Sequence, residues 1–467
     1  MPGPLCQTGR GMLSGGHMEP AFAARPLNAF RPAQPLRGGA RVPGDKSISH
    51  RALMFGALGI GETRITGLLE GEDVLRTAAA MRALGATVER EAVEREAGAW
   101  RVAGRGIGAL TPPEDVLDMG NSGTAARLLC GILASHDIFS VMTGDASLRK
   151  RPMQRVIEPL RAAGAVFAAR PGGRLPLAIQ GAREALPLRY RLPVASAQVK
   201  SAILLAGLNA RGTTEVEEPE PTRDHSENML RHFGATVTVT THGATRHIAL
   251  AGQPELRGAD IAVPADPSSA AFPIVAGLLV PGSRVRLNAV GLNPLRTGLL
   301  ETLDEMGATL AVHNRQVQGG EPVGDVMVEH AELAAVDVPP ERAPSMIDEY
   351  PILAVACAFA RGTSRLRGLA ELRVKESDRL TATAAMLRAG GVRAEIERDD
   401  LIIHGMANPP GGGLVQTHMD HRLAMSTLVF GQRTARPMAI DDSRFIETSF
   451  PGFVELMRGL GAGIAEA

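Results

Sequence analysis

The stretch Pro43-Gly44-Asp45-Lys46-Ser47-Ile48-Ser49-His50-Arg51 runs directly into the apolar segment Ala52-Leu53-Met54-Phe55-Gly56-Ala57-Leu58. Pro-Gly is typical of a turn, the polar residue after it can cap a helix, and the apolar segment predicts a buried helix. Lys46, Ser47 and Arg51 would then lie at the helix N-terminus, with Ser47 and Arg51 on one face. The free N–H groups and positive dipole end of the helix add to these two cations. The stretch therefore predicts an anion-binding site.

The same arrangement recurs five more times, with polar residues that precede an apolar, Ala- and Leu-rich segment. The other copies open at Asn121-Ser122-Gly123-Thr124, Ser196-Ala197-Gln198, Asp266-Pro267-Ser268-Ser269, Asp348-Glu349 and Asp420-His421-Arg422. Ordinary N-capping by Ser, Asp and Asn explains part of this pattern. Lys, Gln, His and Arg are not cap residues, so their recurrence at these helix starts indicates a binding role.

A second signature is an amphipathic helix that ends before a glycine and is followed by strand-like residues. It recurs at glycines 85, 164, 234, 307, 390 and 461, which gives a repeat of about 75 residues. Each repeat reads as a buried helix, a strand, an amphipathic helix and two strands. This alternation predicts an α/β fold made of six repeats.

Six repeats are too many for one core, so we expect two domains of three repeats each. One domain is expected over residues 45–262, and the other over residues 27–44 together with 263–467. The strand around Leu36–Val42 is thereby assigned to the distant C-terminal half. The two chain crossings predict a hinge near Gly44 and near Ala262–Pro264.

Composition restricts the function classes. Lys plus Arg and Asp plus Glu number 50 each, so the chain lacks the net basic field of a nucleic-acid or acidic-membrane surface. It has neither an apolar run of about 18 residues nor a signal segment, which predicts a cytoplasmic protein. The three cysteines have no metal-type spacing, and Cys130 and Cys357 lie in apolar runs. Residues 1–26 are rich in Gly, Pro and Ala, and a disordered tail is expected there, with Met18 as a plausible native start.

Several cationic segments admit simpler explanations. Gly44-Asp45-Lys46-Ser47 is similar to a nucleotide phosphate loop, but Asp45 separates the glycine from the lysine and argues against a kinase. Arg149-Lys150-Arg151 could form a solvated basic loop. Lys375, Glu376 and Arg379 could form salt bridges on a helix surface.

Five segments together resemble the 5-enolpyruvylshikimate-3-phosphate synthase family, in order and at matching separations. They are Pro43 to Arg51, Ser196 to Lys200, Ile347-Asp348-Glu349, Leu372 to Arg379 and Asp420-His421-Arg422. The resemblance implies an inside-out α/β barrel fold, in which each of two domains contains three βαβαββ repeats with buried parallel helices. It also implies transfer of the enolpyruvyl group of phosphoenolpyruvate to the 5-hydroxyl of shikimate 3-phosphate, with release of phosphate, in aromatic amino acid biosynthesis. A monomer without cofactor or metal is expected.

The resemblance also assigns roles to residues. The shikimate 3-phosphate site would contain Lys46, Ser47, Arg51, Ser196, Ala197, Gln198, Arg223, Asp348 and Lys375. The phosphoenolpyruvate site would contain Lys46, Gly123, Arg151, Gln198, Arg379, His421 and Arg422. Asp348 and Glu376 would be the acid and base, with Lys46 near the bridging oxygen. Two phosphates and two carboxylates require such a density of cations and oriented N–H groups.

The chain departs from the better-known branch of that family at Thr448, where that branch has a lysine. In this respect it is similar to the glyphosate-tolerant branch. That branch usually has Ala where this chain has Gly123, and Asn-x-Thr-Arg where this chain has Asn293-Pro294-Leu295-Arg296.

Two alternatives are weighed against this interpretation. UDP-N-acetylglucosamine enolpyruvyl transferase has the same fold and co-substrate, but it carries a reactive cysteine where this chain has Ala146. A non-catalytic anion-binding relative would have lost an acid or base, whereas Asp348, Glu376 and Lys46 are all present.

Overall fold

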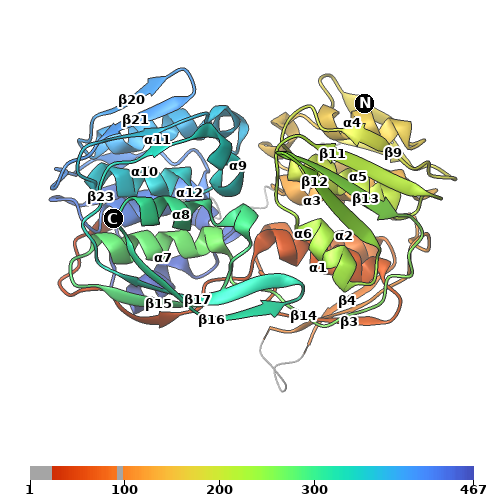
Figure 1. Ribbon diagram of the computed structural model, residues 1–467, viewed down its shortest axis with the longest axis horizontal. Helices are drawn as coiled ribbons and strands as arrows, with labels where there is room; N and C mark the ends of the chain where they lie inside the picture. Colours follow the sequence, from red (N-terminus) through yellow and green to blue (C-terminus); the bar gives the residue numbers. More distant parts are fainter. Residues whose placement is uncertain (1–23, 92–97) are drawn as a thin grey trace, which may run out of the picture.

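The computed structural model of the chain describes residues 24–91 and 98–467, which form two lobes that stand side by side (Figure 1). The tail expected over residues 1–26 lies outside the described residues as far as residue 23. Near its end, the backbone N–H of Arg25 donates to Asp442 Oδ1 over 3.2 Å, and the Arg25 carbonyl accepts from Ser443 N over 2.9 Å.

The six expected buried helices are present, three in each lobe. They are α1 (Lys46–Leu58), α3 (Gly123–Ala134), α5 (Ala197–Gly207), α7 (Pro267–Leu279), α10 (Tyr350–Phe359) and α12 (His421–Phe430). The side chains that cap five of them with hydrogen bonds to backbone N–H groups belong to Asp45, Ser122, Ser196, Asp266 and Asp420. The start of α10 differs, because the short helix α9 (Ala343–Met346) leads into it and Glu349 makes no such capping bond.

The six amphipathic helices are also present, each on the outer side of its repeat. They are α2 (Glu72–Ala83), α4 (Gln154–Ala162), α6 (His225–His232), α8 (Gly298–Glu305), α11 (Arg379–Ala389) and α13 (Phe453–Gly459). Five of the glycines expected after them have positive φ. In the fifth repeat the left-handed residue is Gly391 instead, with φ 82°. Gly390 closes α11 with φ −82°, and a Cβ there would lie 2.2 Å from the Phe430 ring.

The strands among the described residues form six four-stranded sheets. Three sheets each come from one continuous repeat, in the order leading strand, second strand, last strand, third strand. They are β6 (Leu117–Asp118), β7 (Phe139–Thr143), β9 (Arg174–Gln180) and β8 (Val166–Arg170); β10 (Arg189–Arg191), β11 (Thr213–Glu218), β13 (Thr245–Ala251) and β12 (Val237–His242); and β18 (Asp337–Val338), β19 (Thr363–Leu366), β21 (Asp400–His404) and β20 (Ala394–Glu397).

The other three sheets take one strand from a distant part of the chain. They are β14 (Ile261–Ala262), β3 (Glu62–Thr66), β5 (Trp100–Ala103) and β4 (Thr87–Arg90); β2 (Arg37–Ala40), β15 (Arg284–Gly291), β17 (Glu321–Glu329) and β16 (Thr309–Gln318); and β22 (Leu414–Val415), β23 (Met438–Ile440), β1 (Leu27–Phe30) and β24 (Gly463–Glu466). β2 precedes α1 but pairs in parallel with β15 of the fourth repeat, whereas β14 precedes α7 but pairs in parallel with β3 of the first. β2 and β14 therefore each complete a sheet in one lobe, whereas the buried helix that follows each strand belongs to the other lobe.

The two chain crossings lie directly against each other. Asp45 N donates to the Pro264 carbonyl over 2.7 Å, and Asp266 N donates to the Pro43 carbonyl over 2.9 Å. Gly44 sits in the centre of this bridge, where a Cβ would lie 2.0 Å from the Gly67 carbonyl oxygen. On either side of the crossing lies a separate hydrophobic core, one built from residues between 48 and 263 and the other from residues 27–42 and 265–464.

We predict that Gly44→Ala destabilises the fold, because its methyl group would collide with backbone that the paired crossing holds in place. Overpacking of this kind costs about 1–3 kcal/mol. The midpoint of thermal unfolding should fall relative to wild type. Gly459→Ala is the matched control, since a Cβ at Gly459 meets nothing within 4 Å. An equal midpoint for the two variants would contradict the steric argument.

Candidate active site

The N-termini of the six buried helices converge on one cavity of about 410 Å³ between the lobes. Each helix contributes residues from its start or from just before it to the lining: Lys46 and Ser47 (α1), Gly123 and Thr124 (α3), Ala197 and Gln198 (α5), Asp266 and Ser268 (α7), Ile347 and Asp348 (α10), and His421 and Arg422 (α12). Because each helix N-terminus carries a partial positive charge, their convergence makes the cavity attractive to anions even before side chains are counted.

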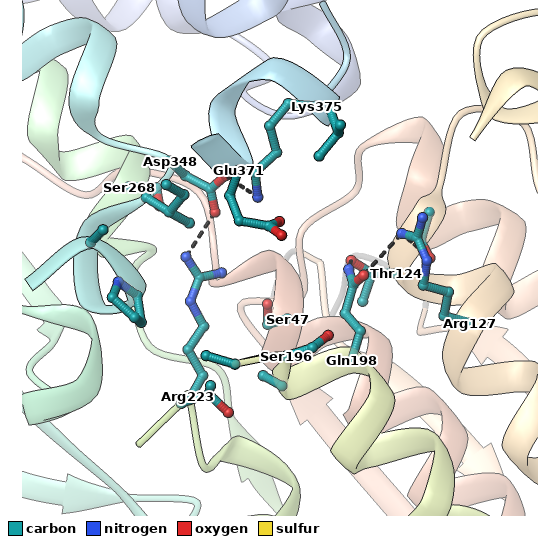
Figure 2. A pocket seen from close by; sticks show the side chains of 18 of the residues that line it. Ser47, Thr124, Arg127, Ser196, Gln198, Arg223, Ser268, Asp348, Glu371 and Lys375 are labelled. Atoms are coloured by element: carbon teal, nitrogen blue, oxygen red, sulfur yellow. Dashed lines mark hydrogen bonds and ion pairs between the residues drawn. The ribbon is translucent and has the colours of Figure 1, made fainter. Parts of the chain in front are cut away.

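Asp348 is the carboxylate at which the two lobes meet across the cavity (Figure 2). The Arg223 guanidinium of the first lobe reaches its Oδ2 over 2.7 Å, whereas Arg379 and Lys375 of the second lobe lie 3.3 and 3.5 Å from its Oδ1. Arg422 donates to the Asp348 carbonyl over 3.2 Å. Burial by itself would raise the pKa of Asp348, but these four cations outweigh it and hold that pKa well below its usual value. Asp348 is therefore ionised among these cations.

Glu376 lies in a comparable environment on the same side of the cavity. It forms an ion pair with Arg379, and its Oε1 lies 3.9 Å from Arg151 Nη1 of the opposite lobe. Burial opposes ionisation, but Arg379 and Arg151 lower the pKa of Glu376 below its usual value. Both carboxylates that the sequence singles out are thus charged and compensated by arginines from both lobes.

Lys46 projects from the first turn of α1 and forms an ion pair with Asp73 of α2. Asp73 is 4% exposed, and its Oδ1 has no hydrogen-bond partner among the described residues. Asp73 thus orients the Lys46 side chain, and its Oδ1 atom can still accept a hydrogen bond. Sequence reasoning missed Asp73, because an acidic residue in the first turn of an outer helix is an ordinary helix feature.

Gln198 joins the starts of two buried helices in the first lobe (Figure 2). Its Nε2 donates to Thr124 Oγ1 over 3.0 Å, and its Oε1 accepts from Arg127 Nη1 over 2.9 Å. Arg127 was also missed, although an arginine inside the apolar run of α3 is a detectable signal. Burial, together with repulsion by Arg155 and Arg151, lowers the pKa of Arg127 to about 10. These three guanidiniums line the cavity and form a cationic wall, with Glu376 Oε1 3.9 Å from Arg151 Nη1.

Gly123 lies against this wall at the first residue of α3. A Cβ there would lie 2.9 Å from Arg127 Nη1 and 3.2 Å from Arg151 Nη1. Glycine therefore leaves open the space in front of the two guanidiniums and the helix N-terminus, as close approach of an anion to backbone N–H groups requires.

His421 lines the cavity as an uncharged group. Burial and the neighbouring Arg422 lower its pKa to about 3, so the ring is neutral at physiological pH. It can offer a hydrogen bond to a substrate but no ionic attraction.

Most of the residues singled out from the sequence line this cavity. Those that do are Lys46, Ser47, Gly123, Arg151, Ser196, Ala197, Gln198, Arg223, Asp348, Lys375, Glu376, His421 and Arg422. Arg51 and Arg379 do not line it. Arg51 lies behind Ser47 and donates to Ser226 Oγ, Ser201 Oγ and the Ser47 carbonyl over 2.8, 2.8 and 2.9 Å.

Arg379 is 1% exposed and lies behind Glu376 and Asp348. Its Nε donates to Asp420 Oδ2 over 2.8 Å, in addition to the two ion pairs described above. Three carboxylates thus surround one guanidinium. Arg379 therefore organises acidic side chains.

Residues 24–91 and 98–467 contain neither a metal-type cluster nor a membrane-spanning helix. No group of three or more His, Cys, Asp or Glu side chains there is arranged to hold a metal ion. No helix in the same part of the chain combines the length and the apolar character that crossing a membrane needs. Cys130 and Cys357 are buried and unpaired.

The fold and the site define a class of α/β protein that has two lobes of three repeats and a cavity lined by cations and helix N-termini between them. Residues 30–457 match the EPSP synthase (3-phosphoshikimate 1-carboxyvinyltransferase) family, and the chain belongs to that family. It is 73% identical over 445 residues to the 3-phosphoshikimate 1-carboxyvinyltransferase of Acidiphilium cryptum, covering 95% of this chain and 99% of the relative. It is 70% identical to that of Granulibacter bethesdensis, covering 96% and 99%. A solved EPSP synthase structure from Acinetobacter baumannii shares 44% identity with a TM-score of 0.84, covering 95% of this chain and all of the other.

Family membership confirms the two-domain α/β repeat fold and the activity expected from the sequence. The chain transfers the enolpyruvyl group of phosphoenolpyruvate to shikimate 3-phosphate and releases phosphate, in the shikimate pathway of aromatic amino acid biosynthesis. This decides against the nucleotide-sugar enzyme and the non-catalytic relative as alternatives.

Proposed function

We propose that the residues that line the cavity divide the two substrates between them. Shikimate 3-phosphate is held by the first-lobe helix starts together with two second-lobe side chains, namely by Lys46, Ser47, Arg51, Ser196, Ala197, Gln198, Arg223, Asp348 and Lys375. Phosphoenolpyruvate is held by Lys46, Gly123, Arg151, Gln198, Arg379, His421 and Arg422. The observation that carries this proposal is the excess of guanidinium and ammonium groups over carboxylates around the cavity.

The positions of Arg51 and Arg379 restrict how they take part. Arg51 acts through Ser47, whose carbonyl accepts from it, and so holds the first turn of α1 in shape. Arg379 shares its charge among three carboxylates, so Arg422 is the more available cation for the phosphoenolpyruvate carboxylate.

The chemistry needs a base for the attacking hydroxyl and an acid for the methylene carbon, and then the reverse. Asp348 and Glu376 are proposed for these steps, with Lys46 beside the bridging oxygen. Their lowered pKa values make them weak bases while these cations surround them. Bound phosphates and carboxylates neutralise the same cations, so substrate binding should raise both pKa values toward those of working acid–base groups.

The proposed acid–base roles predict the outcome of two isosteric substitutions. Asp348→Asn and Glu376→Gln keep size and remove proton transfer, so kcat should fall by about 10² to 10⁴ while substrate binding is largely kept. Steady-state kinetics and calorimetric binding of shikimate 3-phosphate measure the two quantities. Thr448→Ser, outside the proposed machinery, is the control. A variant with wild-type turnover would remove that residue from the mechanism.

We also propose that the lobes 45–262 and 27–44 with 263–467 are domains that close on their substrates about the paired crossing. The separate cores support rigid bodies, and the two crossings are the only covalent links between them in the described chain. Cations and positive helix ends face each other across the cavity, so anions between them should favour closure.

Small-angle X-ray scattering tests this hinge. The radius of gyration should fall when shikimate 3-phosphate is added, because the anion removes repulsion between the lobes. Shikimate without its phosphate is the control and should have a smaller effect. An unchanged radius with the phosphorylated substrate would count against closure.

We further propose that the enzyme is a cytoplasmic monomer without nucleic-acid partners. The balance of 50 basic and 50 acidic residues supports small anions, and not nucleic acid, as its ligands. Light scattering should give a mass near 49.1 kDa, and twice that mass would show a dimer.

A further inference from the structure

A buried ion cluster around Arg296 lies beside the crossing of the two lobes. Arg296 ends the short helix η2 (Pro294–Arg296) and is 4% exposed. Its guanidinium faces three carboxylates: Nη1 lies 3.6 Å from Asp45 Oδ2, and Nη2 lies 3.3 Å from Asp266 Oδ1 and 3.9 Å from Glu349 Oε1. Nη2 also donates to Ser268 Oγ over 2.7 Å, and Ser268 in turn donates to Glu349.

Each of the three carboxylates stands at the start of a buried helix. Asp45 caps α1 and immediately precedes Lys46, and Asp266 caps α7. Glu349 immediately follows Asp348 and precedes α10. One guanidinium therefore holds three helix starts, two of which carry residues proposed for catalysis.

The cluster also joins the two lobes. Asp45 opens the buried helix of the first lobe, whereas Arg296, Asp266 and Glu349 belong to the second. The backbone N–H of Lys46 lies 3.5 Å from Asp266 Oδ2, so Lys46 itself is tied across the boundary. The paired crossing supplies the covalent frame, and Arg296 adds a charged contact on its cavity side.

The charges of the cluster do not balance. Three carboxylates face one arginine, whose pKa they raise against the opposing effect of burial. Burial and the like charge of Asp45 raise the pKa of Asp266. Glu349 Oε2 and Arg296 Nε are buried without hydrogen-bond partners among the described residues. Well-packed apolar residues often stabilise a fold better than such a cluster, so stability does not account for it.

The Arg296 guanidinium is also not available to bind a substrate. It borders the cavity, but its guanidinium is occupied by Asp45, Asp266, Glu349 and Ser268. We propose that Arg296 is a positioning residue, which fixes the starts of α1 and α10 and thereby sets Lys46 of one lobe against Asp348 of the other. This inference rests on the proposed roles of Lys46 and Asp348.

Arg296→Lys tests the inference, because lysine keeps the charge but cannot reach three carboxylates at once. A displacement of catalytic groups by about 1 Å can cost about 10²-fold in rate, so kcat should fall by that order with smaller changes in both KM values. The control is Arg365→Lys. Arg365 contacts Asp400 and Glu397 over 2.8 and 3.1 Å within one sheet and does not line the cavity. Equal kcat in the two variants, after correction for folded protein, would overturn the proposal.

Glu349→Gln provides a second test that does not depend on the folding of the arginine variant. It removes one negative charge from an overcharged cluster, so the unfolding midpoint should stay or rise while kcat falls. A lower midpoint with unchanged kcat would show a purely structural cluster and overturn the inference. Asp348→Asn distinguishes failure of the proposed function from failure of the positioning role. If Asp348→Asn retains turnover, the proposed function fails. If Asp348→Asn loses turnover while Arg296→Lys has normal kinetics, only the positioning role of Arg296 is refuted.

Discussion

The structure depends on one electrostatic arrangement, in which six buried helices point their N-termini at a single cavity. Parallel helices that meet end to end leave their free N–H groups and positive dipole ends unopposed by any helix C-terminus. Lys46 and Arg422 at those ends, and Arg223 and Lys375 from the segments before α6 and α11, add four cations. Such a concentration of positive charge costs stability unless anions occupy it. The two-lobed fold divides this charge between two bodies, which we propose the substrates bring together.

The sequence predicted the part of this arrangement that depends on local signals. A turn, a capping residue and an apolar run lie within a few positions of one another, so the starts at Lys46, Gly123, Ala197, Pro267 and His421 could be placed from the residues alone. The start of α10 was harder, because a preceding short helix replaces the cap. α11 ends before Gly390, as predicted, but the left-handed residue is the adjacent Gly391, and only the fold shows which of the two glycines is left-handed.

Long-range contacts account for what the sequence could not predict. The parallel pairing of β14 with β3 leaves no trace in the two residues Ile261 and Ala262. Asp73 looks like an ordinary first-turn acid until the fold brings it to Lys46. Arg296 contacts carboxylates that are far away in the sequence, and no residue next to Arg296 in the sequence predicts these contacts. Sequence motifs predict which residues belong to the site, but the contacts that orient their side chains depend on the tertiary structure.

The ion pairs that line the cavity support the proposal that one site attracts polyanions and also performs proton transfer. Arg223 and Lys375 keep Asp348 ionised, and Arg379 keeps Glu376 ionised. These ion pairs partly neutralise the cations of the cavity. An incoming phosphate competes with these carboxylates for the same cations. As it takes them, each carboxylate loses the interaction that lowered its pKa and gains proton affinity. In the proposed mechanism, binding of the charged groups thereby activates Asp348 and Glu376 as the acid–base pair, and both functions follow from the same contacts.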